Sequence, residues 1–329
     1  MTLRLTMLGP IMVIGSILVL FLWHIAVGAK SIPILTVAES LWHFDRTEFD
    51  HVVIRNLRLP RAIFAVTVGA SLAVAGSLMQ GVTRNPLAEP GLLGLLAGAS
   101  FAVVAAVGFF GLATPGWIPV VAAAGALGGA VLVWTIAARV PGGATPLSLI
   151  LSGAAVTAFL GALITLMQLM DEQTFESLRV WLTGTLAGRR MEVFVWCLPW
   201  FIGGLIIAIA VARQVTALAM GEETAIGLGV DIARLKIIVL ICVVVLTAAS
   251  VAVAGPLGFV GLVIPHVVRL LVGSDYRLIV PYSAGIGAAY LLVVDIAARL
   301  VLAPAEISTG IVTALLGAPF FVWLVRTRL

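Results

Sequence analysis

Long apolar stretches alternate with short polar connections along nearly all of the 329 residues. Each stretch holds about 20 residues, and a helix of that length spans roughly 30 Å, the hydrocarbon thickness of a bilayer. Because backbone groups inside a bilayer must be satisfied within the segment, we expect these stretches to be helices. The pattern predicts an all-α polytopic membrane protein with about ten transmembrane helices in one domain, residues 1–329. The predicted spans are 6–29, 61–81, 92–112, 118–138, 147–170, 193–213, 235–254, 257–272, 279–301 and 308–326.

The connections between the spans are short and rich in glycine and proline, which are typical of turns. Three of them, 30–60, 171–192 and 214–234, are long enough to hold structure of their own. Ten crossings place both chain ends on the same side of the membrane. The 19 Lys and Arg residues divide almost evenly between the two sides, so the positive-inside rule leans only slightly towards cytoplasmic termini.

The composition agrees with a membrane location. Hydrophobic residues make up 62% of the chain and charged residues only 10%, against about 25% charged residues in soluble domains. The net charge of +4 comes from arginines that stand singly at the ends of apolar stretches, whereas a nucleic-acid-binding protein clusters its basic residues. We therefore expect contact with membrane lipid and no nucleic-acid partner.

Sequence signals of catalysis are missing. There is no GxxxxGK[ST] phosphate-binding loop, no Ser/His/Asp pattern and no sign of paired carboxylates in a polar pocket. Cys197 and Cys242 lie in apolar runs without metal-ligand spacing. We expect neither enzymatic activity nor a metal or cofactor bound by this chain.

The span 61–81 carries a small residue at every fourth position. That spacing places the small residues on one helix face, where they permit close contact with another helix. They are Ala65, Gly69, Ala73, Ser77 and Gly81. Two polar corners are predicted to flank the span. Their residues are Arg58, Pro60 and Arg61 before it and Asn85 and Pro86 after it.

The connection between the sixth and seventh spans has the features of a short helical loop. Glu222 and Glu223 suit the first turn of a helix, because the helix dipole favours acidic residues there. Gly227 and Gly229 favour the end of that helix, and Asp231 can cap the start of the next one. An ordinary connecting loop and a docking element for a soluble partner both fit this pattern.

Glycines and a proline interrupt the apolar run 255–269, which indicates a broken helix shielded by its neighbours. The interrupting residues are Gly255, Gly258, Gly261 and Pro265. His266 has no second His, Cys or carboxylate at ligand spacing, so a structural role is favoured over a metal or haem ligand. In the ninth span, Asp295 and Arg299 lie four residues apart and can pair. As ionisable groups in a membrane segment they are either functional residues or a structural ion pair.

These motifs and their order resemble the iron-siderophore, haem and vitamin B12 permeases of ABC importers, the FecCD/BtuC-type family. The family pattern has RLPR before a span and NPLAxPG after it, then GExxAxxLGV. A later GPxxFVGLxxPHxxR run corresponds to residues 255–269, the most specific match. The motif around the last span is also matched, except that Ser308 stands where the family has proline. The matching residues there are Glu306, Gly310, Thr313, Gly317 and Pro319.

The resemblance implies a BtuC-like type II ABC importer permease in the bacterial cytoplasmic (inner) membrane, with both termini in the cytoplasm. Its partners would be a second permease subunit, two ABC ATPase subunits that bind ATP and Mg²⁺, and a periplasmic or lipid-anchored binding protein. The expected cargo is a ferric siderophore, and import of haem or vitamin B12 is the alternative. An ion-coupled secondary transporter is the rival from another class, with Asp295 as its candidate ion-binding residue.

The resemblance also assigns roles to individual residues. It implies that the loop 214–234 couples the permease to the ATPase. The residues concerned are Gly221, Glu222, Glu223, Ala225, Leu228 and Gly229. It further implies that the binding protein docks on Arg58, Arg61 and Arg299 through carboxylates, which pair well with arginine. Arginines at the ends of spans can also be anchors that snorkel to the membrane interface, and the sequence leaves that reading open.

Overall fold

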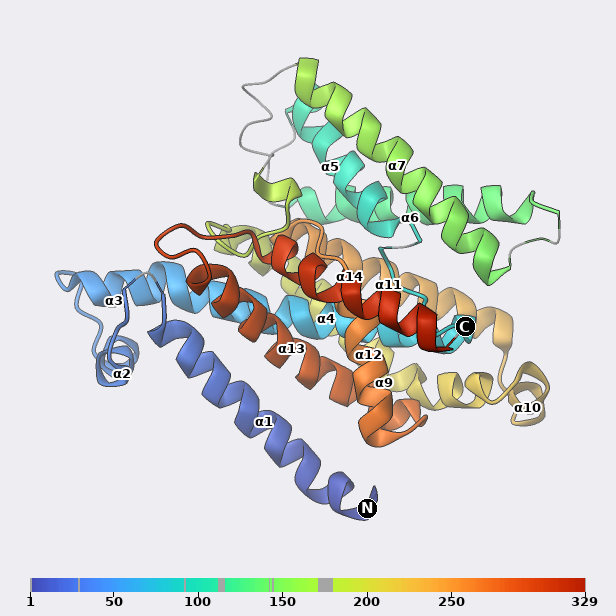
Figure 1. The fold of residues 1–329 in the computed structure, drawn as a ribbon, viewed down its shortest axis with the longest axis horizontal. Coiled ribbons are helices and arrows are strands. Elements are labelled where there is room, and N and C mark those ends of the chain that lie inside the picture. Colours follow the sequence, from blue (N-terminus) through green and yellow to red (C-terminus); the bar gives the residue numbers. More distant parts are fainter. Residues whose placement is uncertain are drawn as a thin grey trace.

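The computed structural model describes residues 2–28, 30–91, 93–111, 116–141, 143, 145–170 and 180–328. Within these ranges all regular secondary structure is helical (Figure 1). Each of the ten predicted spans contains a helix, so the predicted all-α class is confirmed. The ten helices are α1 (Thr2–Ala26), α4 (Leu59–Thr83), α5 (Leu95–Phe110), α6 (Ile118–Ala138), α7 (Pro146–Met170), α9 (Met191–Ala219), α11 (Ile232–Ala254), α12 (Val260–Val272), α13 (Tyr276–Leu300) and α14 (Thr309–Arg328).

Short helices occupy two of the three longer connections, and the third, 171–192, contains helical residues 180–182. The connection 30–60 holds α2 (Ile34–Trp42), α3 (Phe49–Val53) and a π-helical turn, η1 (Ile54–Arg58). The connection 214–234 holds α10 (Glu222–Gly227), as its acidic start and glycine-rich end predict. Residues 171–179 of the third connection lie outside the described residues.

Seven helical stretches in the described part of the chain are long and apolar enough to cross a membrane. The helices α5, α12 and α14 are apolar but shorter. α12 has 13 residues, roughly 20 Å of helix. It is shorter than the predicted span 257–272 because Phe259 adopts a left-handed backbone conformation, with φ of 67°, and interrupts the run.

The predicted corner at Pro60 is wrong. The helices α3, η1 and α4 follow one another without a break and form a 35-residue stretch, Phe49–Thr83. A proline inside a helix lacks the backbone donor and clashes with the carbonyl four residues earlier. Here the wider π-helical turn directly precedes Pro60, and the N–H of Leu59 bonds to the carbonyl of Ile54, five residues back. The wider turn accommodates the ring, so the helix continues through it.

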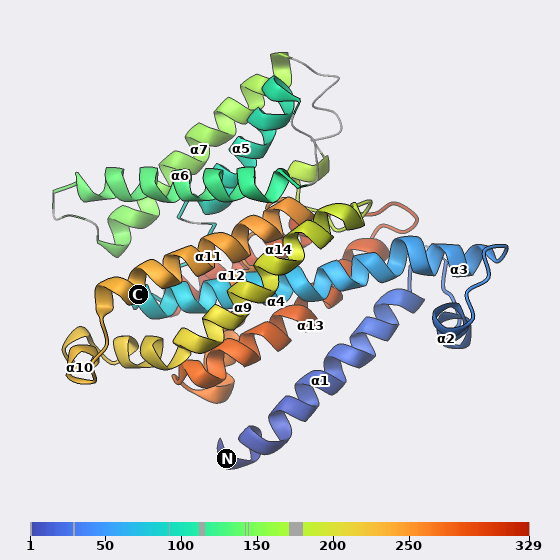
Figure 2. The ribbon, with the colours of Figure 1, turned by 180° about the vertical axis from the view of Figure 1, so that it is seen from behind.

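α4 is the central helix of the molecule. α9, α11, α12 and α13 pack around it (Figures 1 and 2). A Cβ atom at Gly69 would lie 2.3 Å from the carbonyl oxygen of Gly287 in α13, and one at Gly81 would lie 2.4 Å from Cγ1 of Val215 in α9. The predicted close helix–helix contact along the small-residue face is therefore confirmed.

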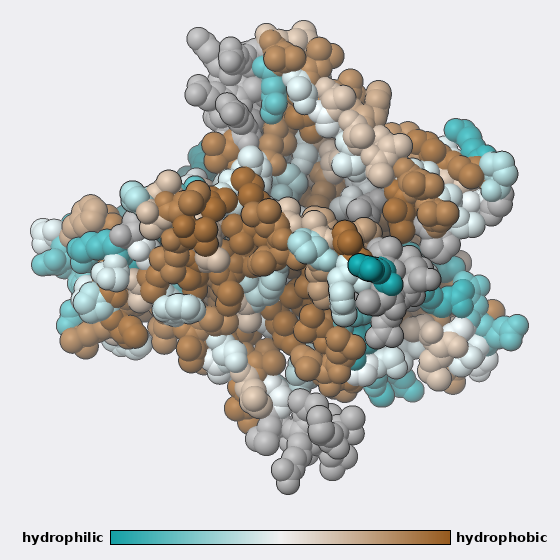
Figure 3. All heavy atoms as spheres, viewed as in Figure 1, coloured by the Kyte–Doolittle hydropathy of each residue, from teal (hydrophilic) through white to brown (hydrophobic). Residues whose placement is uncertain are grey.

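The helices α5, α6 and α7 form a separate group on one side of this body (Figures 1 and 2). They pack on one another, and α5 and α6 contact α11. The start of α1, the end of α14 and α10 lie at one end of the molecule, which we call the α10 end. The helices α2 and α3 lie at the opposite end, the α3 end (Figures 1 and 2). On the face shown in Figure 3, hydrophobic surface lies mostly in the middle and polar surface gathers towards the two ends, as expected of a membrane-spanning body.

Candidate functional site

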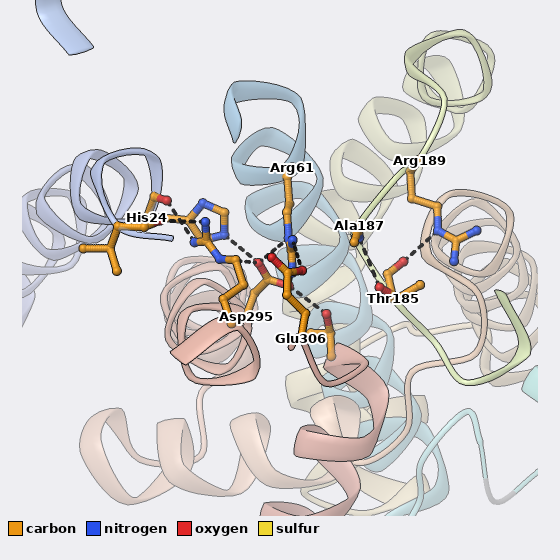
Figure 4. A network of polar contacts seen from close by, with 10 residues as sticks. His24, Arg61, Thr185, Ala187, Arg189, Asp295 and Glu306 are labelled. Carbon is orange, nitrogen blue, oxygen red and sulfur yellow. Dashed lines mark hydrogen bonds and ion pairs between the residues drawn. The ribbon is translucent and has the colours of Figure 1, made fainter. Parts of the chain in front are cut away.

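A buried polar network at the α3 end centres on Asp295 near the end of α13 (Figure 4). One carboxylate oxygen, Oδ2, lies 2.7 Å from Nε of Arg61 in α4 and 2.8 Å from Nε2 of His24 in α1. The other, Oδ1, accepts hydrogen bonds from Nη2 of Arg61 at 3.1 Å and from the hydroxyl of Thr309 at 2.7 Å. Asp295, His24 and Thr309 are 0% exposed. One carboxylate therefore joins α1, α4, α13 and α14.

Two further charged groups extend this network. Nη1 of Arg61 lies 2.7 Å from Glu306, whose side chain is 38% exposed and connects the network to the surface. Arg299 donates to the carbonyls of His24 at 2.9 Å and Val27 at 2.8 Å, and its Nε lies 3.6 Å from Oδ2 of Asp295. The predicted pair of Asp295 and Arg299 is thus confirmed as part of a larger structural network.

Arg58, at the end of the π-helical turn, also has partners within the chain. Its Nη1 donates to the carbonyls of Ile25 and Ala26, both at 2.8 Å, and its Nη2 donates to that of Lys30. The carbonyls of Ile25 and Ala26 belong to the last turn of α1 and have no partner further along that helix, and the carbonyl of Lys30 lies just beyond it. The guanidinium therefore caps the end of α1 and ties it to the start of α4.

The structure thus places the three arginines expected to meet the binding protein in one buried region instead of on an exposed rim. Arg58, Arg61 and Arg299 are only 8%, 9% and 3% exposed. Their guanidinium groups bind main-chain carbonyls and carboxylates of this chain, so they do not snorkel as single anchors into the membrane interface.

A concave pocket of about 350 Å³ opens beside this network. Four arginines line it, and Glu306 is the one carboxylate among the lining residues. They are Arg58, Arg61, Arg189 and Arg299. Arg189 was not singled out from the sequence. Its Nε donates to the carbonyl of Thr185 at 2.9 Å, and burial lowers the pKa of its guanidinium to about 10, so the group stays charged at neutral pH (Figure 4).

The loop at the opposite end is built as its sequence predicts. Gly221 and Gly229 have φ of 131° and 78°, which glycine adopts most easily, and they bracket α10. Oδ1 of Asp231 accepts a hydrogen bond from the backbone N–H of Arg234 at 3.0 Å, which caps α11 as predicted. Nζ of Lys236 lies 3.0 Å from Glu222, and this contact lowers the pKa of the Glu222 carboxyl.

The surface of this loop combines acidic and apolar groups. Ala225 is buried and anchors α10, whereas Glu222 and Glu223 are exposed. The apolar side chains around them are exposed as well. They are Met220, Ile226 and Leu228, at 69%, 64% and 67%. The result is a small protruding element with an apolar surface at the α10 end.

The broken-helix motif lies at the start of α12. A Cβ at Gly255 would lie 2.1 Å from the carbonyl oxygen of Trp181, whereas Gly258 has open space around it. Gly261 packs on α4, Pro265 lies inside α12, and the ring of His266 meets Phe320 edge-on at 5.6 Å. Within the described residues no group of three or more His, Cys, Asp and Glu side chains is placed to hold a metal ion.

Side chains from the second corner and from α4 hold this broken helix. The corner itself is confirmed, because Arg84 adopts a left-handed φ of 51° and Oδ1 of Asn85 accepts from the N–H of Leu87 across Pro86. The carboxyl of Glu89 accepts a hydrogen bond from the N–H of Phe259, and burial raises its pKa to about 7. Glu89 was not selected from the sequence, although it lies within the NPLAEPG motif.

The last-span motif serves close packing. The N–H of Gly310 donates to the carbonyl of Gly184 at 2.7 Å, and a Cβ at Gly317 would lie 2.2 Å from that of Phe259. The hydroxyl of Thr313 donates to the carbonyl of Gly310, and Pro319 lies inside α14. Ser308, which replaces the family proline, shares a hydrogen bond of 2.7 Å with the hydroxyl of Thr183. This contact fixes the start of α14 without a proline.

Comparisons with known proteins agree with this architecture. Residues 16–327 match the model of the FecCD transport family. The chain belongs to the FecCD transport family. The iron(3+)-hydroxamate import system permease protein FhuB of Bacillus subtilis is 42% identical over 302 residues, 92% of this chain and 78% of FhuB. The cobalamin import system permease protein BtuC of Halobacterium salinarum is 41% identical over 303 residues, 92% of this chain and 81% of that protein.

A solved structure has the same fold. It is described as a metal-chelate type ABC transporter in an inward-facing conformation. The TM-score is 0.79 at 31% identity, and the match covers 96% of this FecCD chain and 99% of the other. The chain is therefore an all-helical membrane permease with the fold of an ABC transporter permease, and its family consists of transport components.

Proposed function

We propose that this FecCD protein is the membrane-spanning permease subunit of an ABC importer that carries a ferric siderophore or a related iron chelate into the cytoplasm. One observation carries the proposal. The same membrane body presents a protruding acidic and apolar helix, α10, at one end and an arginine-lined pocket at the other. An importer of this type needs a docking element for an ATPase on one side and one for a cargo-delivering protein on the other.

The α10 end would face the cytoplasm, together with both termini. Exposed Ile226 and Leu228 would fill a groove in one ATPase subunit, and Glu222 and Glu223 would border the contact. Buried Ala225 would transmit the movement to α9 and α11, which flank the loop. ATP and Mg²⁺ would be bound by the ATPase subunits, and closure of the ATPase pair would move the helices by alternating access.

The α3 end would face the binding protein. The pocket beside Arg58, Arg61, Arg189 and Arg299 suits an acidic side chain, because arginine binds carboxylates through two parallel hydrogen bonds. Three of these arginines already stabilise the network around Asp295 and the end of α1. The docking role would therefore rest on a rigid, preformed surface, with Arg189 as the group least engaged within the chain.

The proposed cargo is inferred from similar proteins, because several of them are named for iron chelates. These include permeases for iron(3+)-hydroxamate and Fe(3+)-citrate in Bacillus subtilis, while others are named for hemin and cobalamin. Haem or cobalamin import by the same architecture is the alternative. An ion-coupled secondary transporter is disfavoured, because Asp295, its candidate ion-binding residue, is already bound by His24, Arg61 and Thr309.

A second permease subunit would complete the pathway. α7 and α14 expose large apolar side chains, including Leu151, Phe159 and Leu315, that a partner helix can cover.

Assembly of the complex tests the proposal directly. The tagged permease should co-purify with its ATPase from a membrane extract, and the binding protein loaded with a ferric siderophore should stimulate ATP hydrolysis by that complex. A permease that purifies folded and binds neither partner contradicts the proposal.

A further inference from the structure

A second concave feature lies between the group α5–α7 and the body formed by α4 and α11. It is a cleft of about 710 Å³, within the size range of sites that bind small molecules. Its walls are mostly apolar, and several wall residues are large side chains exposed on helices that can span the membrane. They are Val131 and Trp134 of α6 and Ile237 and Leu240 of α11. The cleft therefore opens where lipid hydrocarbon surrounds the protein.

Charged groups gather among the lining residues of this cleft at the α10 end. Arg84 ends α4, Lys236 lies in the first turns of α11, and Glu222 begins α10. The carboxylate of Glu222 lies 3.0 Å from Nζ of Lys236 and 4.0 Å from Nη2 of Arg84. The three side chains are 46%, 46% and 49% exposed. Two cations share one carboxylate, so this part of the cleft carries a net positive charge.

We propose that the cleft binds an anionic phospholipid, with an acyl chain against the apolar walls and the phosphate beside Arg84 and Lys236. The proposal rests on charge complementarity together with the apolar depth of the cleft. A guanidinium binds phosphate oxygens through two hydrogen bonds, and an ammonium adds a point charge. Anionic lipids are held near membrane surfaces by such basic side chains. A zwitterionic lipid fits the walls equally well but gains less from the positive rim.

A lipid bound in this cleft would affect the contacts that hold α10 in place. A phosphate at Arg84 and Lys236 competes with Glu222, the first residue of α10, for the same two cations. The lipid therefore bridges α4 and α11 and loosens the tie that holds α10. Lipid composition is then expected to change the mobility of α10.

Quenching of tryptophan fluorescence tests the site, because Trp134 lies in the cleft wall. The full-length permease, delipidated in mild detergent, is titrated with brominated phosphatidylglycerol or brominated phosphatidylcholine. The signal of interest is the part of the quenching that the Trp134→Phe variant loses. We expect this Trp134-dependent quenching to saturate at a mole fraction of phosphatidylglycerol several-fold lower than the mole fraction of phosphatidylcholine that is needed. The double variant Arg84→Gln/Lys236→Gln should remove this preference, which is roughly fivefold for the one positive charge that Glu222 leaves unbalanced.

A matched control removes the same number of positive charges at positions away from the cleft. Arg213→Gln/Arg234→Gln removes two exposed cations, and Arg234 lies two residues from Lys236, on a different face of α11. This variant should keep the preference for phosphatidylglycerol. Ala130→Leu, which fills part of the cleft wall, should weaken binding of both lipids. Equal quenching by the two lipids in the unmodified protein overturns the proposal, and so does equal loss of preference in both double variants. Absence of Trp134 quenching by either lipid, as when a protein segment fills the cleft, also overturns it.

Discussion

Asp295 shows how one buried charge can organise several helices of a membrane protein. Its carboxylate is 0% exposed and binds His24, Arg61 and Thr309, while Arg299 approaches it from the next turn of the same helix. An isolated ion in such surroundings is costly, and pairing together with hydrogen bonding removes most of that cost. The network therefore stabilises the arrangement of α1, α4 and α13 more through the penalty for breaking it than through net attraction.

We expect Asp295→Asn to destabilise the protein by about 3–5 kcal/mol, because it leaves buried guanidinium groups without their carboxylate. Thermal melting of the detergent-solubilised chain, followed by size-exclusion fluorescence, measures the change. Asp231→Asn, at the exposed cap of α11, should cost at most about 1 kcal/mol. If the cost at Asp295 comes from unpaired charge, Arg61→Met/Asp295→Leu should recover part of it. An Asp295→Asn protein that melts like the Asp231→Asn control contradicts this account of the network.

Glu89 gives a prediction of pH dependence. Burial raises the pKa of its carboxyl to about 7, against 4.5 for an ordinary glutamate. Between these values the native state holds the proton more tightly than the unfolded state, so stability falls as pH rises from about 4.5 and levels off above about 7. The full effect is on the order of 3 kcal/mol. Glu89→Gln should flatten the melting temperature against pH over this range, and an unchanged slope in that variant contradicts the assignment.

Among the single helices, α10 is the one proposed to couple movement of the ATPase to the permease, and a variant of α10 can test that role. Glu222→Arg/Gly229→Trp alters the exposed acidic start of α10 and the glycine that follows it, where φ is 78° and no atom crowds the Cβ position. We expect the variant to insert and fold but to lose ATP-dependent uptake in cells. The matched control Gly143→Trp places the same side chain at another glycine outside the loop, with φ of 76° and open space around its Cβ position. Full uptake by the α10 variant would remove the coupling role.

The elements themselves were largely predictable from the sequence. Runs of about 20 apolar residues have few alternatives to a helix in a bilayer, and the acidic and glycine-rich ends of α10 and the cap at Asp231 mark local boundaries. The corner at Pro60 failed because the π-helical turn before it is stabilised by tertiary contacts of Arg58, which local propensity does not contain.

The candidate site was predictable only in part. The pair of Asp295 and Arg299 follows from helical spacing, but the pairing of Asp295 with Arg61 and His24 joins residues 234 and 271 positions apart. The spacing of residues along the sequence does not predict such long-range contacts. Arginines that look like surface groups in the sequence are therefore not recognisable as buried until the fold is known. Arg189 looks like an ordinary loop charge until the fold places it beside the other three arginines.

For the molecule as a whole, we expect the proposed docking of the binding protein at the α3 end to depend on the arginine-lined pocket. Arg189 is the suitable probe, because replacing Arg58 or Arg61 would also damage the internal network. Arg189→Glu should weaken association with the binding protein about tenfold or more and slow its on-rate most at low salt, as measured by surface plasmon resonance. The neighbouring Arg190→Glu, at an exposed side chain that pairs with Glu192, should have little effect. Equal losses in both variants would indicate general charge repulsion instead of docking in the pocket.

We expect ATP hydrolysis by partner subunits to drive import of an iron chelate through this FecCD permease. The most direct measurement is uptake of ⁵⁵Fe-labelled siderophore into proteoliposomes that contain the permease and its ATPase, with the loaded binding protein outside and ATP inside. We expect uptake that requires both ATP and the binding protein and that continues when ionophores abolish the ion gradients. Uptake that proceeds without ATP and collapses with a protonophore would contradict the account and favour an ion-coupled transporter.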